Sequence, residues 1–232
     1  MVAFPPGTEI IVSPPATVAA NVLLDEALAR SAFSTGRSQL RFWWGTDLTV
    51  VVARSERIEE VAWPDRCRRD GVAIARRISG GGAVLQGPGV LNYSWTAPDD
   101  GFTPVDRAFA LGGLLIRRAL AALGVVAVPR GISDVAVGER KISGSAQARV
   151  ERGILLHGTL LVDLEPGLVS RYLKHPPREP DYRRGRSHAE FIVSLRRLLP
   201  QVTDEDVMRA CLAAARLLIR PARPSEPERG EA

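Results

Sequence analysis

The sequence predicts an α+β fold, in which helices flank a mixed, largely antiparallel β-sheet sandwich. Two observations favour this class. Helix-like and strand-like segments alternate irregularly along the 232 residues, and successive strand-like runs are often separated only by short turns with glycine, as in β-hairpins. A doubly wound βαβ fold would need a regular alternation of strands and helices. A chain of this length can also bury a core large enough to fold without disulfides or a structural metal.

In the first hundred residues, apolar residues at helical spacing predict helices over 18–33 and Pro64–Asp70. Thr17 is a candidate N-cap of the first helix, and Gly36 lies just beyond its end. Runs of β-branched and aromatic residues predict strands at Glu9–Val12, 40–44, 48–53, 72–77 and 90–96. The short connection at 45–47 predicts that strands 40–44 and 48–53 form a hairpin, and residues 98–101 predict a turn.

Residues 104–123 carry the longest helical pattern, which begins at Pro104 and ends at Gly124. Two more helices are predicted at 166–174 and 204–219, the latter with Thr203 as its N-cap and acidic residues in its first turn. Four strands joined by tight glycine turns are predicted at 125–128, Asp134–Val137, Arg140–Val150 and 154–162. The stretch 175–188, rich in Pro, Arg and Tyr, is expected to be irregular.

These elements predict one main domain at 18–219, preceded by a strand and turn at 1–17 and followed by a disordered, proline-rich tail at 220–232. No apolar run is long enough to span a membrane, and no secretory signal is visible. The two cysteines cannot form a disulfide framework. Composition therefore excludes a secreted scaffold, a membrane protein and a cysteine-rich zinc module, and we expect a cytoplasmic protein with no membrane partner.

The net charge is +5, and only Lys141 and Lys174 among the 31 basic residues are lysines. Eight basic residues against three acidic ones in 171–197 form a basic stretch that would favour an acidic partner surface, although it could equally be a solvated face. The aromatic residues do not interleave with the arginines, so no nucleic-acid partner is expected.

Three segments could carry chemistry. The first runs from Arg76 to Gly89 and contains three consecutive glycines after a strand and two arginines. Backbone N–H groups can approach an anion closely where there is no Cβ, so the run suits a phosphate, although a flexible turn is an equally simple interpretation. It lacks the Gly-Lys-Ser/Thr of a P-loop and does not match the dinucleotide fingerprint.

The second segment, 133–147, predicts a hairpin with Lys141 at the start of its second strand, beside small residues that leave room for a ligand. Lys141 could hold a phosphate or a carboxylate, or be an ordinary exposed lysine. The third segment, 156–163, places a His–Gly–Thr sequence inside an apolar strand, where a satisfied core histidine is the simpler interpretation. His175 and His188 show no metal-ligand spacing with His157, so no protein-held metal is predicted.

In their order along the chain, these segments resemble the catalytic domain of the superfamily of lipoate–protein ligase A, biotin ligases and octanoyltransferases. Residues 76–84, with Asn92 downstream, match the lipoyl-adenylate loop of the ligase. Asp134 and residues 140–146 match the catalytic-lysine hairpin, and 157–161 match the strand that follows it. The resemblance covers about residues 18–215. It implies a biotin/lipoate ligase type of fold for the domain at 18–219.

The resemblance implies a two-step reaction, in which lipoate and ATP, accompanied by Mg²⁺, give lipoyl-AMP and a lysine of a lipoyl carrier domain then takes the acyl group. It implies that Lys141 is catalytic and that Arg77 adds positive charge for the phosphates of ATP. The ligand-binding residues that it implies are Arg77, Ser79, Gly80, Gly81, Gly82, Ala83, Val84, Leu85, Asn92, Asp134, Ser143, Gly144, Ser145, Ala146, His157, Gly158 and Thr159.

The implied partners are lipoyl carrier domains of 2-oxoacid dehydrogenase complexes or an H-type protein of glycine cleavage. The sequence lacks the C-terminal accessory domain of the longer ligases, so either a separate accessory subunit supplies its role or that role is dispensable. The sequence departs from the ligases at 85–89, where Gln86-Gly87-Pro88-Gly89 is closer to the octanoyltransferase version of the loop.

Two alternatives stay open. Octanoyltransferases use a cysteine nucleophile, which the resemblance would put near Val126 or residues 175–177, and this sequence has none there. That favours an ATP-dependent ligase over a thioester transferase, but lysine-assisted transfer from a carrier- or protein-bound acyl donor remains possible. A non-catalytic binder that retained the fold is the other alternative.

Overall fold

The computed structural model describes residues 3–99 and 103–219. The strands are β1 Glu9–Val12, β2 Gln39–Trp44, β3 Thr49–Val52, β4 Ala73–Arg76, β5 Val84–Gln86, β6 Val90–Pro98, β7 Val128–Arg130, β8 Asp134–Val137, β9 Arg140–Val150 and β10 Gly153–Leu161. The helices are α1 Val18–Thr35, α2 Ile58–Val61, α3 Pro64–Asp70, α4 Val105–Ala122, α5 Pro166–Tyr172, α6 His188–Phe191, α7 Leu195–Leu198 and α8 Asp204–Leu218, with a 3₁₀ turn, η1, at Asp181–Arg183.

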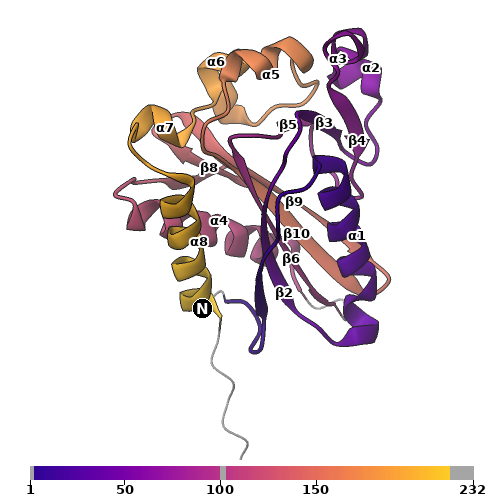
Figure 1. Ribbon diagram of the computed structural model, residues 1–232, viewed down its shortest axis with the longest axis vertical. Coiled ribbons are helices and arrows are strands. Elements are labelled where there is room, and N and C mark those ends of the chain that lie inside the picture. The colour runs from indigo at the N-terminus through magenta and orange to yellow at the C-terminus, as the bar shows by residue number, and fades with distance from the viewer. Residues whose placement is uncertain (1–2, 100–102, 220–232) are drawn as a thin grey trace, which may run out of the picture.

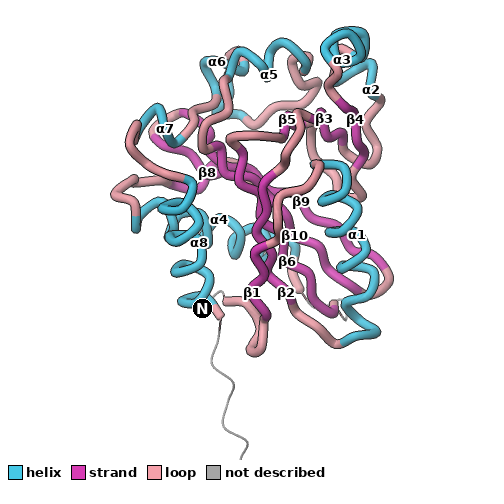
Figure 2. Tube along the Cα trace, viewed as in Figure 1, coloured by secondary structure: helices cyan, strands magenta, loops and turns pink. Residues whose placement is uncertain are grey.

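The strands form two sheets (Figures 1 and 2). A seven-stranded sheet has the order β1-β2-β6-β10-β9-β8-β7, and a three-stranded sheet has the order β4-β3-β5. Only the pairs β1–β2 and β3–β4 are parallel among the pairings of the described strands. The predicted α+β class with a mixed, largely antiparallel arrangement is therefore confirmed.

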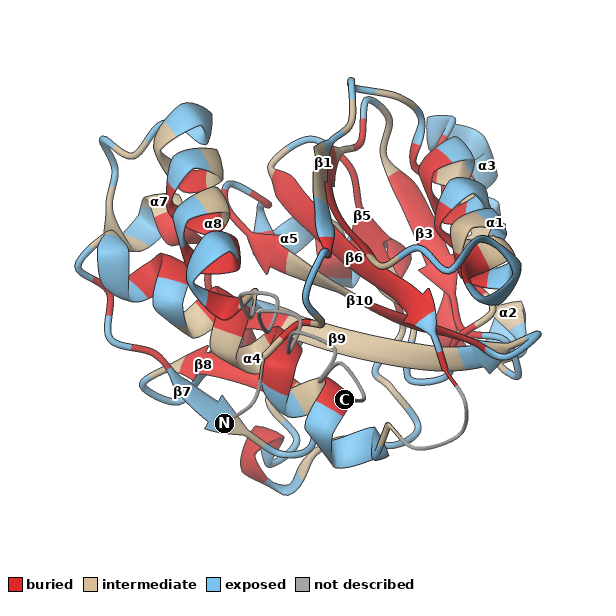
Figure 3. Ribbon diagram, turned by 90° about the horizontal axis from the view of Figure 1, so that it is seen from below, coloured by how far each residue is buried: buried red, intermediate tan, exposed pale blue. Residues whose placement is uncertain are grey.

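Helices cover both faces of the large sheet. The helix α1 packs against β6 and β10 on one face, whereas α4 and α8 pack on the other (Figure 1). The largest apolar cluster lies between that second face and α4 and α8. In Figure 3, β6 and β8 are largely buried, whereas β9 is largely intermediate. A second cluster joins the small sheet to α2, α3, α5 and α6. This second cluster also contains Val90, Ala136 and Leu161 of the large sheet, so it joins the two sheets.

The predicted helix caps are present. The side chain of Thr17 accepts a hydrogen bond from the backbone N–H of Ala20, and α1 ends at Gly36 in the left-handed conformation with φ of 67°. Thr203 forms a capping box with Asp206 at the start of α8. These local signals located both helices because each satisfies backbone groups that the first or last turn leaves unpaired.

The predicted hairpin of 40–44 with 48–53 is wrong. β2 pairs with β1 and β6 in the large sheet, whereas β3 pairs with β4 and β5 in the small one. The connection between them contacts α1 instead, since Asp47 Oδ1 accepts a hydrogen bond of 2.7 Å from the N–H of Val18 at the start of that helix. A Cβ on Gly45 would lie 2.4 Å from a methyl group of Val18. The turn residues therefore form a crossover packed against α1.

Smaller differences concern short elements. The strand predicted at 125–128 lies at β7, and β5, α2, α6 and α7 were not predicted. Residues 175–188 are irregular as expected, apart from η1 and the first residue of α6. The predicted turn at 98–101 falls partly, and the predicted tail at 220–232 wholly, outside the described residues. Among the helices described, none has the length and apolar character needed to cross a bilayer.

Candidate active site

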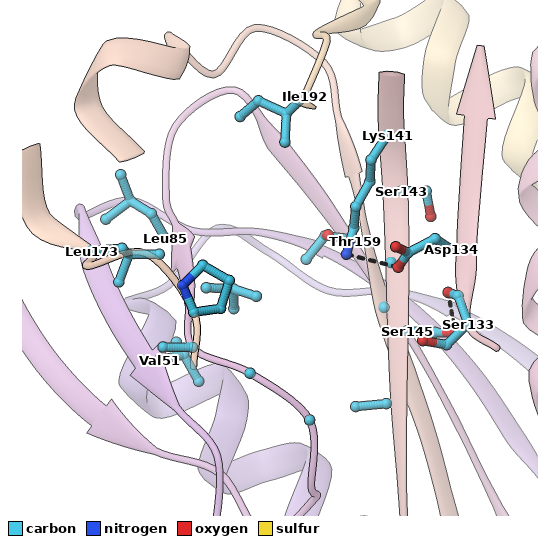
Figure 4. Close-up of a pocket in the computed structure, with 18 of the residues that line it drawn as sticks. Val51, Leu85, Ser133, Asp134, Lys141, Ser143, Ser145, Thr159, Leu173 and Ile192 are labelled. Atoms are coloured by element: carbon cyan, nitrogen blue, oxygen red, sulfur yellow. Dashed lines mark hydrogen bonds and ion pairs between the residues drawn. The ribbon is translucent and has the colours of Figure 1, made fainter. Parts of the chain in front are cut away.

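A cavity of about 720 Å³ lies between the two sheets, beside the segment that carries α5, η1 and α6. Its two sides differ in chemistry (Figure 4): Lys141, Asp134 and Thr159 lie on one side, whereas apolar side chains such as Leu85 and Leu173 lie on the other. All of the sequence-predicted site residues line this cavity except Ser79 and Gly80. The structure therefore brings together three motifs that are far apart in the sequence.

One row of residues across the large sheet supplies the polar side. Successive partners in register are Trp43 on β2, Asn92 on β6, Thr159 on β10, Gly144 on β9 and Asp134 on β8. All five line the cavity. Because directly opposed residues in a sheet lie on the same face, the register alone gathers them.

Lys141 and Asp134 form an ion pair, with 2.7 Å between Lys141 Nζ and Asp134 Oδ1. The pairing register skips Ile142 on β9, which is the extra residue of a β-bulge opposite Val135 and Ala136. The lysine side chain lies over Gly144, where a Cβ would be 2.6 Å from both Lys141 Cε and Nζ. The glycine is therefore what allows the ammonium to reach Asp134.

Arg77 lines the cavity, but its guanidinium is bound to the glycine loop. It is 5% exposed. Its guanidinium donates to the carbonyls of Gly80 and Gly82 at 2.8 Å each and to Ser79 Oγ at 2.9 Å. Burial lowers the pKa of Arg77 to about 10, so it stays charged at neutral pH. Arg77 thus holds the shape of the glycine loop from behind and adds a positive field.

Gly80, Gly81 and Gly82 are exposed, and Gly81 has φ of 95°, a conformation that favours glycine. Ser79 is buried behind the loop. The loop can therefore present backbone N–H groups to an anion at the cavity while its carbonyls are bound by Arg77.

His157 is joined to the loop through Ser79, whose Oγ lies 2.6 Å from His157 Nε2. Arg77 Nε donates to the same Ser79 Oγ, so the serine hydroxyl links the arginine to the imidazole. Burial, and then the charge of Arg77, lowers the pKa of His157 to about 3. His157 is therefore neutral at physiological pH.

This low pKa predicts a pH dependence of stability. An unfolded histidine takes up its proton near pH 6.5, whereas folded His157 does so only near pH 3. The unfolded state then binds more protons as the pH falls, so His157 lowers the free energy of unfolding by up to ~1.4 kcal/mol per pH unit in that window. Urea unfolding of His157→Asn should show a shallower loss between pH 7 and 5 than the wild type. Identical slopes would contradict the assignment.

Six buried polar atoms of side chains that line the cavity lack partners within the described residues, and three of them, Trp43 Nε1, Gln86 Oε1 and Asn92 Oδ1, belong to uncharged side chains. All three side chains line the cavity and are at least 92% buried. A buried polar atom without a partner is costly, so these atoms are candidates to bind a ligand. Asn92 was predicted; Trp43 and Gln86 were not selected. Side chains alternate between the two faces of β2: Leu40 and Phe42 belong to the large core, so Arg41 and Trp43 lie on the other face. This alternation is the signal that could have found Trp43.

The basic stretch 171–197 does not expose all of its charge. Arg183 is 4% exposed. Arg183 and Arg186 each donate to the other's carbonyl and stack over Phe191. Arg178 and Arg184 are exposed and form no ion pair among the described residues, and Arg178 lines the cavity. Only part of the local charge is therefore available to a partner.

Both cysteines are buried away from the cavity lining. Cys67 belongs to the core of the small sheet and Cys211 to that of the large sheet. Burial raises the pKa of both thiols, that of Cys211 to about 12. Neither thiol is thus available as a nucleophile at the site.

The described residues contain no group of three or more His, Cys, Asp or Glu side chains that could hold a metal ion. The donors at the cavity, which are backbone amides, Lys141, and amide and indole groups, suit an anionic or polar organic ligand rather than a cation.

Residues 17–216 match the family model of the lipoyl protein ligase A/B catalytic domain. The "Putative lipoate-protein ligase A" of Aeropyrum pernix is 38% identical over 151 residues, which are 65% of this chain and 56% of that protein. The chain thus matches little more than half the length of that relative.

Two solved structures are similar over most of both chains. One belongs to a study of a bi-partite lipoate protein ligase and its E2 lipoyl domain from Thermoplasma acidophilum, with 25% identity, a TM-score of 0.79, and coverage of 96% of this chain and 88% of that one. The other is a lipoate-protein ligase A bound with ATP, with 25% identity, a TM-score of 0.79, and coverage of 95% and 90%. Together with the family match over nearly the whole domain, the fold and the assembled motifs establish that this chain belongs to the lipoyl protein ligase A/B catalytic domain family.

Proposed function

We propose that this chain is an ATP-dependent lipoate–protein ligase, which activates lipoate as lipoyl-AMP and transfers it to a lysine of a lipoyl carrier domain. The observation that carries the proposal is Lys141, held 2.7 Å from Asp134 at the wall of a cavity with one polar and one apolar side. An ammonium has three N–H donors. With one directed at Asp134, two can bind oxygens of a ligand in the cavity.

In the first step, a carboxylate oxygen of lipoate attacks the α-phosphorus of ATP, and the bond to the bridging oxygen of the β-phosphate breaks to release pyrophosphate. Lys141 would stabilise the negative charge that is shared by the acyl oxygen and the α-phosphate. Gly81 and Gly82, which line the cavity, would donate backbone N–H groups to the adenylate, with Arg77 behind them.

In the second step, the neutral ε-amine of the carrier lysine attacks the acyl carbonyl of the mixed anhydride. An amide bond forms, the bond to the phosphate oxygen breaks, AMP leaves and the amine gives up a proton. The two N–H donors of Lys141 would again face the carbonyl and the leaving phosphate, so one residue serves both half-reactions.

The apolar side of the cavity would hold the hydrocarbon chain of the acid. Its residues come from the core of the small sheet and include Leu85, Leu161, Val169 and Leu173. Burying such a chain contributes about 0.8 kcal/mol per methylene. Trp43 Nε1, Gln86 Oε1 and Asn92 Oδ1 would bind the polar parts of the ligands.

Mg²⁺ would accompany ATP as a complex with its phosphates, since the described side chains offer no preformed set of carboxylate ligands. The carrier would approach the cavity mouth, where Arg178 and the exposed Ile132 line the opening. A lipoyl domain of a 2-oxoacid dehydrogenase is the favoured carrier, since the similar T. acidophilum ligase was analysed with its E2 lipoyl domain. An H-type protein and an accessory subunit are further candidates.

Mass spectrometry of a purified lipoyl domain, after incubation with the protein and with lipoate or octanoate, tests the proposal. We expect a lipoyl adduct on the lysine only when ATP and Mg²⁺ are present. An adduct formed without ATP from an acylated carrier would instead establish an acyltransferase. Binding of the carrier with no adduct under any condition would establish a non-catalytic protein.

A further inference from the structure

Tyr182 contacts the ion pair of Lys141 and Asp134, although it lies outside the three sequence motifs. It lies in η1, within the irregular segment between α5 and α6. Its hydroxyl donates a 2.8 Å hydrogen bond to Asp134 Oδ2, and its side chain is 91% buried at the cavity wall. The other oxygen of the same carboxylate, Oδ1, holds Lys141 Nζ at 2.7 Å. A chain of three polar groups therefore leads from the segment to the ammonium.

We propose that Tyr182 is a positioning residue, which fixes the carboxylate of Asp134 and through it the ammonium of Lys141. This inference rests on the proposed function, in which Lys141 stabilises the reacting oxygens. A lysine side chain has several rotatable bonds and loses considerable rotamer entropy when it is held in one place. A carboxylate that is held at both oxygens cannot rotate away, so the ammonium stays aimed at the cavity.

The segment that carries Tyr182 is internally braced. Glu179 Oε1 accepts a 2.7 Å hydrogen bond from the N–H of Gly185, and Arg186 Nη2 donates to the carbonyl of Tyr182 at 2.7 Å. The ring of Tyr182 packs on Phe191 with 5.1 Å between centroids. These contacts hold the phenol in place, so its hydroxyl presents a fixed donor to Asp134.

The chain that follows this segment reaches the backbone of Lys141. Just after α6, the N–H of Val193 donates a 2.9 Å hydrogen bond to the carbonyl of Lys141. Residues 182–193 therefore hold Lys141 at two points, at its backbone through Val193 and at its ammonium through Tyr182 and Asp134. If the segment served only as a wall, packing of the ring would suffice and the hydroxyl would be dispensable.

Tyr182→Phe keeps the ring and removes only the hydroxyl. With preformed lipoyl-AMP and a lipoyl domain, we expect kcat to fall about 10-fold, since the lost bond is to a charged group, with the KM for the carrier and the melting temperature nearly unchanged. Tyr172→Phe is the matched control, because Tyr172 donates to Asp70 at 3.1 Å and does not line the cavity. It should retain wild-type kcat.

A double-mutant cycle separates positioning from packing. Once Asp134→Asn has removed the carboxylate, Tyr182→Phe should have little further effect on kcat. An equal loss in both backgrounds, or a rise in KM without a fall in kcat, would overturn the inference. A wild-type protein that does not acylate the carrier would overturn the proposed function instead.

A spectroscopic readout does not depend on activity. The chain has only two lysines, so ¹⁵N labelling at Nζ gives two ammonium resonances. Tyr182→Phe should shift or broaden the resonance of Lys141 and leave that of Lys174 in place, and Tyr172→Phe should leave both. An unchanged Lys141 resonance in Tyr182→Phe would overturn the positioning role even if the protein proved to have another activity.

Discussion

Replacing Lys141 by arginine should reduce carrier acylation by about 10²–10³-fold, the usual effect of losing one preorganised transition-state donor, and should leave the melting temperature nearly unchanged. Lys141 Nζ lies so close above the backbone that a Cβ on Gly144 would be 2.6 Å away. A planar guanidinium is wider than an ammonium and cannot take that place without displacing the ligand or Asp134. Lys141→Ala should lose at least as much. The measurement is the rate of adduct formation on a lipoyl domain.

Lys174→Arg is the matched control, since it makes the same change at the other lysine. Lys174 Nζ donates to the carbonyl of Glu59 at 2.5 Å and lies 4.4 Å from the ring centroid of Trp63. A guanidinium can also donate to a carbonyl and stack on an indole, so the activity should be close to that of the wild type. Full activity of Lys141→Arg together with loss in Lys174→Arg would show that the catalytic lysine has been misassigned.

Gly144→Ala should remove most of the acylation activity, although it replaces no ionisable residue. The new methyl group would meet Lys141 Cε and Nζ at 2.6 Å and Asp134 Oδ1 at 3.1 Å. The flexible end of the lysine can swing away into the cavity, so the fold survives but the ion pair does not. We expect a loss of about 10²-fold, comparable to the removal of one oriented donor, with a melting temperature close to that of the wild type.

Gly113→Ala is the matched control, because it makes the same change at a glycine that does not line the cavity. In α4, the nearest atom outside the helix to its added Cβ is a methyl carbon of Val135 at 3.8 Å, an ordinary contact. Activity should be unchanged, and stability should rise slightly because alanine favours helices. A fully active Gly144→Ala would mean that Lys141 works from a different rotamer than the one paired with Asp134.

Local chemistry explains which parts of the fold could be predicted. Thr17, Thr203 and Gly36 satisfy or end the backbone hydrogen bonding of their helices, so their effect does not depend on distant residues. The partition of β2 and β3 between two sheets does depend on them. Asp47 would suit a hairpin turn, but its carboxylate binds the N-terminus of α1 instead. Pairing between strands is non-local, and a short turn between two strand-like runs does not determine it.

The candidate site likewise contains residues that the sequence predicted and residues whose roles it did not predict. The motifs around Lys141, Gly81 and His157 were identified in the sequence because each has an unusual local pattern, and the sheet register then brought them together. The roles of the arginines could not be predicted from the sequence. Arg77 and Arg183 have the same sequence signature as exposed cations, yet both are buried and bind backbone carbonyls. Tyr182 carried no signal, since its partner Asp134 lies 48 residues away.

The placement of Cys67 and Cys211 has a consequence for the redox chemistry of the proposed substrate. Lipoate carries a disulfide in a five-membered ring, and a thiolate opens such a ring by exchange. Here both thiols are enclosed in apolar cores with raised pKa values, and neither lines the cavity. The protein can therefore hold an electrophilic disulfide without being trapped as a mixed disulfide with it. Whether the bound ring is oxidised or reduced is then set by the surrounding solution rather than by the protein.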